Sequence, residues 1–403
     1  YLKTKKLKIT DTISFQRKLF ITGRNALLLV LLGSCVEQFD PKVIAYQSVL
    51  VVDGYLSDKA EPYRITLSRS RALNNEDFLP ELGASVSIIG SEGETYPLVE
   101  SDSGRYVSNP NEFVALTGQS YTLDIVTTSG NHYQSDPVTV KVTPPIDSVY
   151  FKTERRINDD GLEMDGIKIL VDAHDPTAST NYYRYEWKET YEISLAYAAP
   201  WDYDSMAPDP RFPIKPIAVF AANCYNSRRG NSILTVSTDQ LSEDKVSEFE
   251  INYVSTADYK LRKRYSILVE QFALDEDAFH YWSELQKNSE NLGTLFDPLP
   301  YELRGNVRNL DDPDEVIVGY FDAAQSSQMR LFVDGIELRD LSFPSTGCPN
   351  SLDTVALQDI PLNLTRNYLI SVLGPYPVEY VLMAPRRCAD CRVYGSLEKP
   401  DFW

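Results

Sequence analysis

Between residues 46 and 143, apolar and polar positions alternate within short stretches that turn residues separate. The stretches are rich in β-branched and aromatic residues, which is typical of strands in a sheet with one buried face. Many short strands at regular spacing predict an N-terminal β-sandwich of immunoglobulin-like type. The expected strands lie at residues 48–52, 63–68, 84–89, 95–99, 121–127 and 138–142.

Pro144 and Pro145 interrupt this pattern, and because neither proline can donate to a sheet they predict a stiff linker. Residues 146–403 are expected to form a second, larger β-rich domain with one short helix. Its expected strands lie at residues 147–152, 167–172, 182–190, 249–254, 263–272, 315–322 and 328–333.

One segment of the second domain has helical periodicity. Phe279, Trp282 and Leu285 recur at helical spacing behind the acidic residues 275–277, and Gly293 would end the helix. We interpret this stripe as core packing.

The alternation is lost between residues 196 and 230, where five prolines lie among aromatic residues. A long irregular segment inside a compact domain is usually functional or disordered. Two interpretations remain open. Trp201, Tyr203 and Phe212 contact a partner or ligand, or they fold back and cover the second domain's own sheet.

The N-terminus adds a prediction about location. Arg17, Lys18 and Arg24 precede an unbroken apolar run at residues 26–32. Small residues follow and lead to Cys35. A basic region, a short apolar region and a small-residue cleavage site are typical of a secretory signal peptide. The run is too short to span a bilayer, which needs about 20 apolar residues.

The quartet at residues 32–35 resembles the lipobox of bacterial lipoproteins, in which the cysteine receives the lipid and becomes the new N-terminus. We therefore expect residues 1–34 to be removed and Cys35 to carry the anchor. Residues 35–45 would link the anchor to the first domain. An ordinary signal peptide followed by a chance cysteine is the alternative. No later stretch reaches spanning length, so contact with the membrane is expected through the lipid alone.

The charge balance argues against nucleic acid as a partner. The whole chain carries −19 and residues 1–34 carry +6, so the remainder carries −25. Such a surface repels phosphates, and no basic stripe offsets it.

The cysteines indicate an oxidising compartment. Apart from Cys35, the chain contains Cys224, Cys348, Cys388 and Cys391, and an even number in an exported protein favours disulfides. A bridge within the Cys-x-x-Cys at residues 388–391 would close a very small ring, so we favour pairing each of these two with a distant cysteine. A four-cysteine zinc site and free or redox-active thiols are the alternatives.

No catalytic motif stands out. The chain has three histidines, His132, His174 and His280, and lacks both Gly-x-Ser-x-Gly and His-Glu-x-x-His. The polar cluster at 172–176 and the acidic turns at 158–161 and 311–314 are interpreted as loop chemistry, because the turns lack the ligand spacing of a calcium-binding EF-hand. We expect no catalytic residue, metal site or cofactor other than the lipid.

A series of short segments, taken in order, carries a resemblance to a known family. They lie at residues 49–56, 63–68, 83–86, 121–123, 144–148, 181–184, 305–307, 318–321, 388–392 and 400–403. Through them the chain resembles the DUF4249 family of Bacteroidota lipoproteins over nearly all of the region after Cys35.

The resemblance implies a non-enzymatic lipoprotein of the outer membrane that faces the cell exterior. Its partner would be an outer-membrane β-barrel, a TonB-dependent transporter of the SusC type, for which it would capture or pass on a ligand. Residues 36–40 resemble the acidic signal that sends such lipoproteins to the surface. A structural subunit of an outer-membrane assembly or export complex is one alternative. A surface hydrolase with unrecognised carboxylates is another.

Overall fold

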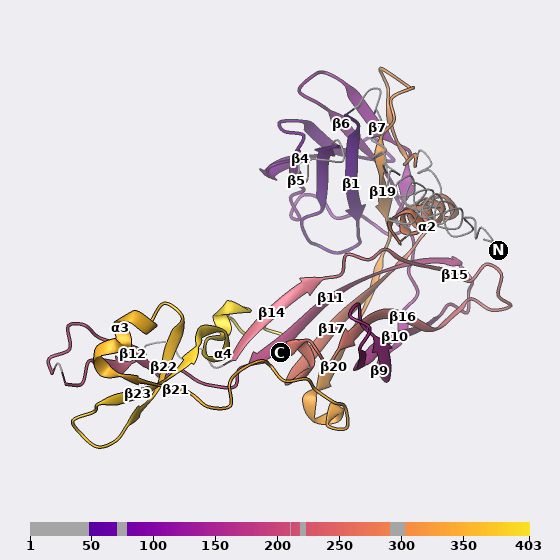
Figure 1. The fold of residues 1–403 in the computed structure, drawn as a ribbon. Coiled ribbons are helices and arrows are strands. Elements are labelled where there is room, and N and C mark those ends of the chain that lie inside the picture. The colour runs from indigo at the N-terminus through magenta and orange to yellow at the C-terminus, as the bar shows by residue number, and fades with distance from the viewer. Residues whose placement is uncertain (1–47, 71–78, 210, 218–222, 291–302) are drawn as a thin grey trace, which may run out of the picture. The chain divides into compact units, whose positions relative to one another are not determined.

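The computed structural model describes residues 48–70, 79–209, 211–217, 223–290 and 303–403, and Figure 1 shows their fold. All of them belong to the unit Ser48–Trp403. Strands make up most of the regular structure, so the prediction of a mainly β protein is confirmed. None of the described helices is long and apolar enough to cross a membrane. The predictions for residues 1–47, including Cys35, lie outside the described residues.

The first sheet comprises ten strands in the described part of the chain. Its order is β18-β7-β6-β3-β4-β5-β2-β1-β19, and β8 pairs with β6. The bounds are β1 Leu50–Leu56, β2 Arg64–Arg69, β3 Ser85–Gly90, β4 Thr95–Asp102, β5 Arg105–Val107, β6 Ser120–Val126, β7 His132–Ser135, β8 Val138–Thr139, β18 Val307–Asn309 and β19 Val318–Ala323.

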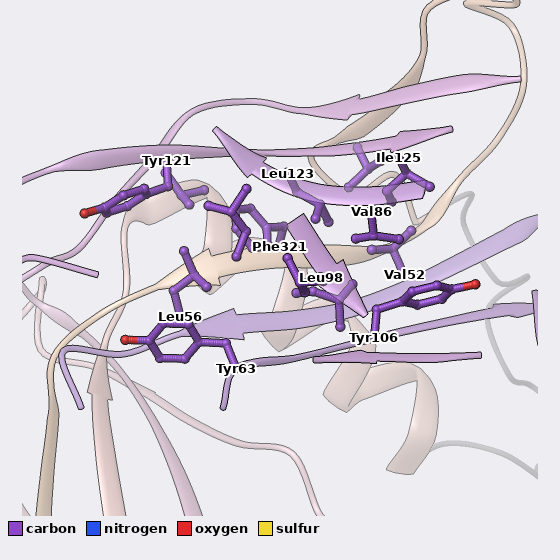
Figure 2. Close-up of a cluster of buried hydrophobic side chains, with 14 of the residues drawn as sticks. Val52, Leu56, Tyr63, Val86, Leu98, Tyr106, Tyr121, Leu123, Ile125 and Phe321 are labelled. Atoms are coloured by element: carbon purple, nitrogen blue, oxygen red, sulfur yellow. The ribbon is translucent and has the colours of Figure 1, made fainter. Parts of the chain in front are cut away.

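The strands of the first sheet enclose one apolar core, which Figure 2 shows. Alternate side chains along each strand fill this core. Strand β1 buries Leu50, Val52 and Leu56, while Asp53 between them is exposed. This is the pattern that the sequence predicts for residues 46–143.

Two strands of the first sheet come from far along the chain. The sequence analysis places residues 307–323 in the second domain, but β18 pairs with β7, and β19 lies parallel to β1. Phe321 of β19 is fully buried in the first core. A boundary at Pro144 therefore does not separate two continuous domains. The difference arises because the local pattern shows that a strand exists and not where it pairs.

The returning strand fits closely against β1. Gly319 has a φ of +121°, and a Cβ there would lie 1.7 Å from the carbonyl oxygen of Val52. The side chain of Asn306 meanwhile donates to the carbonyl of Phe321 (2.7 Å) and accepts from its amide (2.9 Å). Asn306 and Gly319 together hold β19 in register.

Two further sheets pack face to face. A three-stranded sheet has the order β16-β10-β9, and a central sheet has the order β14-β11-β17-β20 with β15 paired to β11. The bounds are β9 Ile146–Ile157, β10 Glu163–His174, β11 Tyr182–Ser194, β14 Asn223–Arg229, β15 Leu234–Ser237, β16 Lys245–Ser255, β17 Arg264–Ala273 and β20 Ser326–Asp334. The core between the two sheets includes Ile167, Ile169, Tyr185, Tyr265 and Ile267.

A small sheet lies within the second region of the chain, with the order β13-β12-β22-β23-β21. The bounds are β12 Trp201–Tyr203, β13 Ile214–Pro216, β21 Asp353–Ala356, β22 Asn367–Leu373 and β23 Tyr380–Pro385. The expectation of an irregular segment at 196–230 is therefore wrong in part, because β12, β13 and β14 all fall within it. Pairing with strands from residues 353–385 orders a proline-rich segment whose own periodicity is weak.

The predicted helix is confirmed as α2, Glu276–Glu290, with Glu276 and Asp277 in its first turn. Gly293, its expected end, lies outside the described residues. Phe279, Trp282 and Leu285 pack against buried Tyr281 and its neighbours, as the core interpretation expects. The other described helices are short: α3 Ile360–Asn363, α4 Arg386–Ala389, and the 3₁₀ turns η1 Tyr259–Leu261, η2 Gly335–Leu338, η3 Leu357–Asp359 and η4 Cys391–Val393.

Candidate ligand-binding cavity

A cavity of about 590 Å³ opens where the first sheet, the central sheet and α2 meet. We call it the junction cavity. Residues Asp53 and Tyr55 of β1 point away from the first core, because side chains alternate along a strand and their neighbours fill that core. Tyr55 then meets Phe272 of β17, with ring centroids 4.7 Å apart. The cavity is thus built from segments distant in the sequence.

Arg184 of β11 supplies a buried cation to the cavity wall. The residue is 8% exposed. Its guanidinium carbon lies 4.4 Å from the ring centroid of Trp282, 5.3 Å from that of Phe272 and 5.8 Å from that of Tyr55. Aromatic faces attract a cation in this geometry. One guanidinium nitrogen pairs with Glu186 at 3.2 Å, whereas Nε has no hydrogen-bond partner among the described residues.

Asp322 of β19 supplies a buried carboxylate. Parallel pairing places it opposite Tyr55, and it is 5% exposed. Oδ1 accepts the amide of Ala323 at 2.8 Å, but Oδ2 has no partner in the described part of the protein. Burial raises the pKa of Asp322 to about 6, and the positive charge of Arg184 opposes that rise.

Trp282 adds a second unpartnered N–H donor. Helix α2 packs on the outer face of β19 through Tyr281 and Tyr320, whose ring centroids lie 5.2 Å apart, and this contact positions Trp282 at the cavity. Its Nε1 is buried without a partner among the described atoms. Trp187 also lines the cavity and carries such a nitrogen, but its side chain is partly buried against the core between the two sheets.

The rim of the junction cavity carries both signs of charge. Glu270 is held by Lys59 at 2.8 Å and by the amide of Gln328 at 2.6 Å. Lys188 and Arg229, both exposed, lie opposite each other on β11 and β14. Like charges directly opposite are mutually repulsive, so an acceptor group placed between them would be favourable. The cavity therefore presents two unpartnered hydrogen-bond donors, Arg184 Nε and Trp282 Nε1, and one unpartnered acceptor, Asp322 Oδ2, between aromatic side chains.

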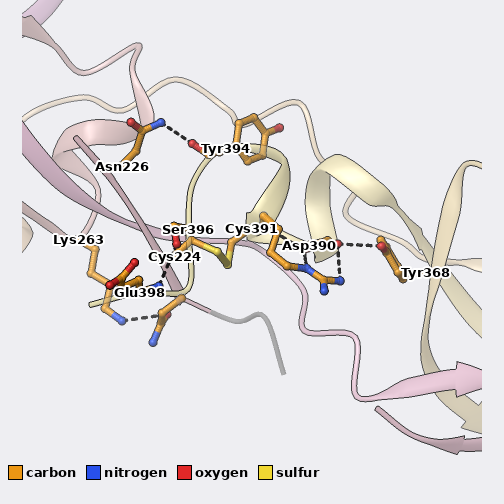
Figure 3. Close-up of a disulfide and its surroundings, with 11 residues drawn as sticks. Cys224, Asn226, Lys263, Tyr368, Asp390, Cys391, Tyr394, Ser396 and Glu398 are labelled. Carbon is orange, nitrogen blue, oxygen red and sulfur yellow. Dashed lines mark hydrogen bonds and ion pairs between the residues drawn. A yellow bond between two sulfur atoms is a disulfide. The ribbon is translucent and has the colours of Figure 1, made fainter. Parts of the chain in front are cut away.

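The cysteines form two disulfides, Cys224–Cys391 and Cys348–Cys388. Each member of the Cys-x-x-Cys pairs with a distant cysteine, as the sequence analysis favours. Figure 3 shows the first bridge joining β14 to η4, where backbone hydrogen bonds between Tyr225 and Ser396 of 2.7 and 2.8 Å run beside it. The bridges fasten the C-terminal segment and do not contribute to the junction cavity.

The aromatic residues proposed for partner contact lie in the small sheet. Trp201, Tyr203 and Phe212 are partly buried against a cluster that includes Ile214 and Met383. They pack on the small sheet, which lies within the second region of the chain. None of them lines the junction cavity, although Tyr203 borders another hollow of about 560 Å³ at the small sheet.

His132, His280 and the acidic clusters have local partners. His132 Nε2 lies 2.7 Å from Asp124 Oδ1, and His280 is exposed on α2, 3.7 Å from Glu276. In the cluster at 172–176, Asp175 accepts hydrogen bonds from Thr177 and Ser179, and these bonds lower its pKa to about 2 against the effect of burial. Within the described ranges, no three His, Cys, Asp or Glu side chains are grouped to hold a metal ion.

Sequence reasoning missed all three central residues of the cavity. Arg184 falls inside a predicted strand, Trp282 inside a predicted core stripe, and Asp322 inside an apolar run. A charged residue within an otherwise buried strand was the available signal, because such residues are rarely buried without a partner.

Fold and cavity together define a mainly β protein with a small-molecule-sized hollow at the junction of two sheets. Residues 36–330 match the family model described as "Domain of unknown function (DUF4249)", which covers more than half of the chain. The protein belongs to this family, as the resemblance implies.

Comparison with curated protein sequences finds no match. Among solved structures, a chain titled "Biofilm associated protein - BSP domain" aligns at 6% identity and a TM-score of 0.12. The alignment covers 72% of this chain and 62% of that one, which is less than two thirds of its length. A TM-score this low carries no argument about fold or function.

Proposed function

We propose that this protein is a non-enzymatic lipoprotein of the outer membrane that captures a ligand for a TonB-dependent transporter of the SusC type. Cys35 would carry the lipid anchor, and the protein would face the cell exterior. The lipobox-like quartet at residues 32–35 and the apolar run before it support the anchor. Two or three acyl chains hold a protein stably on a membrane, where one alone does not.

The observation that carries ligand capture is the junction cavity. Its volume of about 590 Å³ falls within the range of small-molecule sites. Buried polar groups in native proteins are nearly always hydrogen-bonded, so each unpartnered one requires an explanation. Arg184 Nε, Trp282 Nε1 and Asp322 Oδ2 are unpartnered in the described structure and belong to residues that line this one cavity. A ligand that pairs with them accounts for all three.

Affinity purification of the tagged full-length protein from detergent-solubilised outer membranes tests this function. We expect a TonB-dependent barrel in the purified material, identified by mass spectrometry. Purification of the Cys35→Ala variant is the control, because without the lipid the protein should leave the membrane fraction and lose the barrel.

Two outcomes would contradict the proposal. Recovery of an assembly or export barrel instead would favour a structural subunit. If the Cys35→Ala protein is still cleaved at the same place and stays in the membrane fraction after high-salt washing, Cys35 does not carry the lipid anchor.

A further inference from the structure

Two of the unpartnered groups of the junction cavity carry opposite charges. Arg184 is 8% exposed and Asp322 is 5% exposed, so each is more than nine-tenths buried. In the described structure, neither Arg184 Nε nor Asp322 Oδ2 has a hydrogen-bond partner, so these two atoms do not pair with each other. Glu186 pairs with another nitrogen of the guanidinium, and the positive charge of Arg184 acts on Asp322, but Nε and Oδ2 themselves remain without a hydrogen bond. A buried polar atom without a partner is unfavourable, and a ligand group of opposite charge would form the strongest bond to each.

The donors at the Arg184 end suit a carboxylate. Arg184 Nε and Trp282 Nε1 both lack partners, and the guanidinium lies 4.4 Å from the Trp282 ring centroid, so the two N–H groups belong to stacked neighbours. A carboxylate has two oxygens and can accept a hydrogen bond from each donor. Because one donor is cationic, the pair is charge-assisted and stronger than a neutral one.

The acceptor at the Asp322 end suits an ammonium group. Its Oδ1 is already bonded to the amide of Ala323, which leaves Oδ2 for a ligand. An ammonium group donates hydrogen bonds and brings a positive charge directly to Oδ2.

The remaining walls restrict the ligand further. The rim mixes cationic Arg64, Lys188 and Arg229 with acidic Asp53 and Glu61, so the cavity does not select for net charge of either sign. The rings of Tyr55 and Phe272 offer apolar surface between the charged groups.

We infer that the junction cavity recognises a small zwitterion, with the carboxylate on Arg184 and Trp282 and the ammonium on Asp322, as in free amino acids and short peptides. This inference rests on the proposed capture function and names its ligand class. A neutral polyhydroxylated ligand such as an oligosaccharide is the competing class, because hydroxyls can form hydrogen bonds to all three atoms but carry no charge.

Isothermal titration calorimetry on the purified full-length protein at pH 7.5 tests the inference. The probes are L-alanine, dialanine and trialanine, each compared with its N-acetylated and C-amidated form, and maltotriose. We expect at least one free probe to bind and both of its blocked forms to bind at least tenfold more weakly, since each lacks one charge.

Two variants assign the charges to their residues. Asp322→Asn should weaken binding of the free probe at least tenfold and abolish discrimination against the N-acetylated form. Arg184→Gln should likewise weaken binding of the free probe at least tenfold, and it should abolish discrimination against the C-amidated form. Matched controls are Asp159→Asn and Arg228→Gln, which change exposed residues outside the cavity and should bind as the parent does. Circular dichroism verifies that each variant is folded.

Three results would overturn the inference: equal affinity for free and blocked probes, binding of maltotriose without binding of any zwitterion, and no binding of any probe to the folded parent protein. Because none of these measurements involves a barrel, a failed ligand class remains distinct from a failed transporter partnership.

Discussion

The side-chain amide of Asn306 forms a two-bond pair with the backbone of Phe321, with distances of 2.7 and 2.9 Å. Both residues are buried, at 7% and 0% exposure. The pair fastens β19 to the segment that leads into β18, and so holds the two returning strands of the first sheet together.

Replacing Asn306 with Ala should destabilise the protein by roughly 2–6 kcal/mol, because two buried backbone groups lose their partners at about 1–3 kcal/mol each. Chemical denaturation followed by circular dichroism measures the change. Asn111→Ala, at an exposed loop position, is the control and should leave the free energy of unfolding within about 0.5 kcal/mol. A loss no larger than that of the control would show that the pair does not stabilise the strand.

Asp322→Asn should stabilise the protein at neutral pH. Burial raises the pKa of Asp322 to about 6, above the value near 4 expected for an unfolded chain, so the folded state binds the proton more tightly. The native protein therefore loses stability as pH rises from about 4 to 6, and asparagine removes this loss. A two-unit shift corresponds to about 3 kcal/mol.

The measurement is the melting temperature of parent and variant across this range. The two should coincide near pH 4, and the variant should melt several degrees higher at pH 7. A gap that is constant with pH would mean that Asp322 does not titrate as described.

The two disulfides should contribute unequally to stability. They span 167 and 40 residues, and loop-closure entropy assigns about 5 kcal/mol to the longer loop and about 4 kcal/mol to the shorter. Thermal unfolding of the paired variants Cys224→Ser with Cys391→Ser, and Cys348→Ser with Cys388→Ser, tests this. We expect the first pair to melt lower, and the reverse order would show that strain or residual structure outweighs loop length.

Phe212→Ala should loosen the small sheet. The side chain packs beside Ile214, Leu369 and Met383, and truncation of a core aromatic typically destabilises by about 3–5 kcal/mol, less for a partly buried one. Limited proteolysis with mass spectrometry should then show new cuts within residues 353–385, while Leu162→Ala, at an exposed hairpin turn, should show none. If the Phe212→Ala variant resists proteolysis as the parent does but no longer co-purifies with the barrel partner, Phe212 contacts the partner and does not stabilise the sheet.

The sequence predicted elements where the signal is local. Alternation marked β1 because Leu50, Val52 and Leu56 face one core, and helical spacing marked α2 because Phe279 and Trp282 lie on one of its faces. The sequence did not predict strands that form only through pairing with distant segments of the chain. Strands β12 and β13 have three residues each and β13 contains Pro216, and β12 joins a sheet through β22, which comes more than 150 residues later.

The junction cavity could not be predicted for a related reason. Arg184, Trp282 and Asp322 stand in three different elements, and each looks structural within its own segment. Their shared property, an unpartnered buried polar atom, exists only once β1, β19, α2 and the central sheet are in contact. That Cys388 and Cys391 each pair with a distant cysteine, by contrast, could be expected from the small ring that a 388–391 bridge would close, whereas the choice between Cys224 and Cys348 for each could not.

Because β19 pairs with β1, the first sheet cannot be completed until the chain has been made as far as β19. Tyr55 and Ala324, hydrogen-bonded across this junction, are 269 residues apart. Until that length has been synthesised or exported, β1 keeps an open edge, and open strand edges pair with other chains. The first of the described strands is thus among the last to be completed, and a nascent chain that stalls before residue 318 would present a template for aggregation and depend on a holding chaperone.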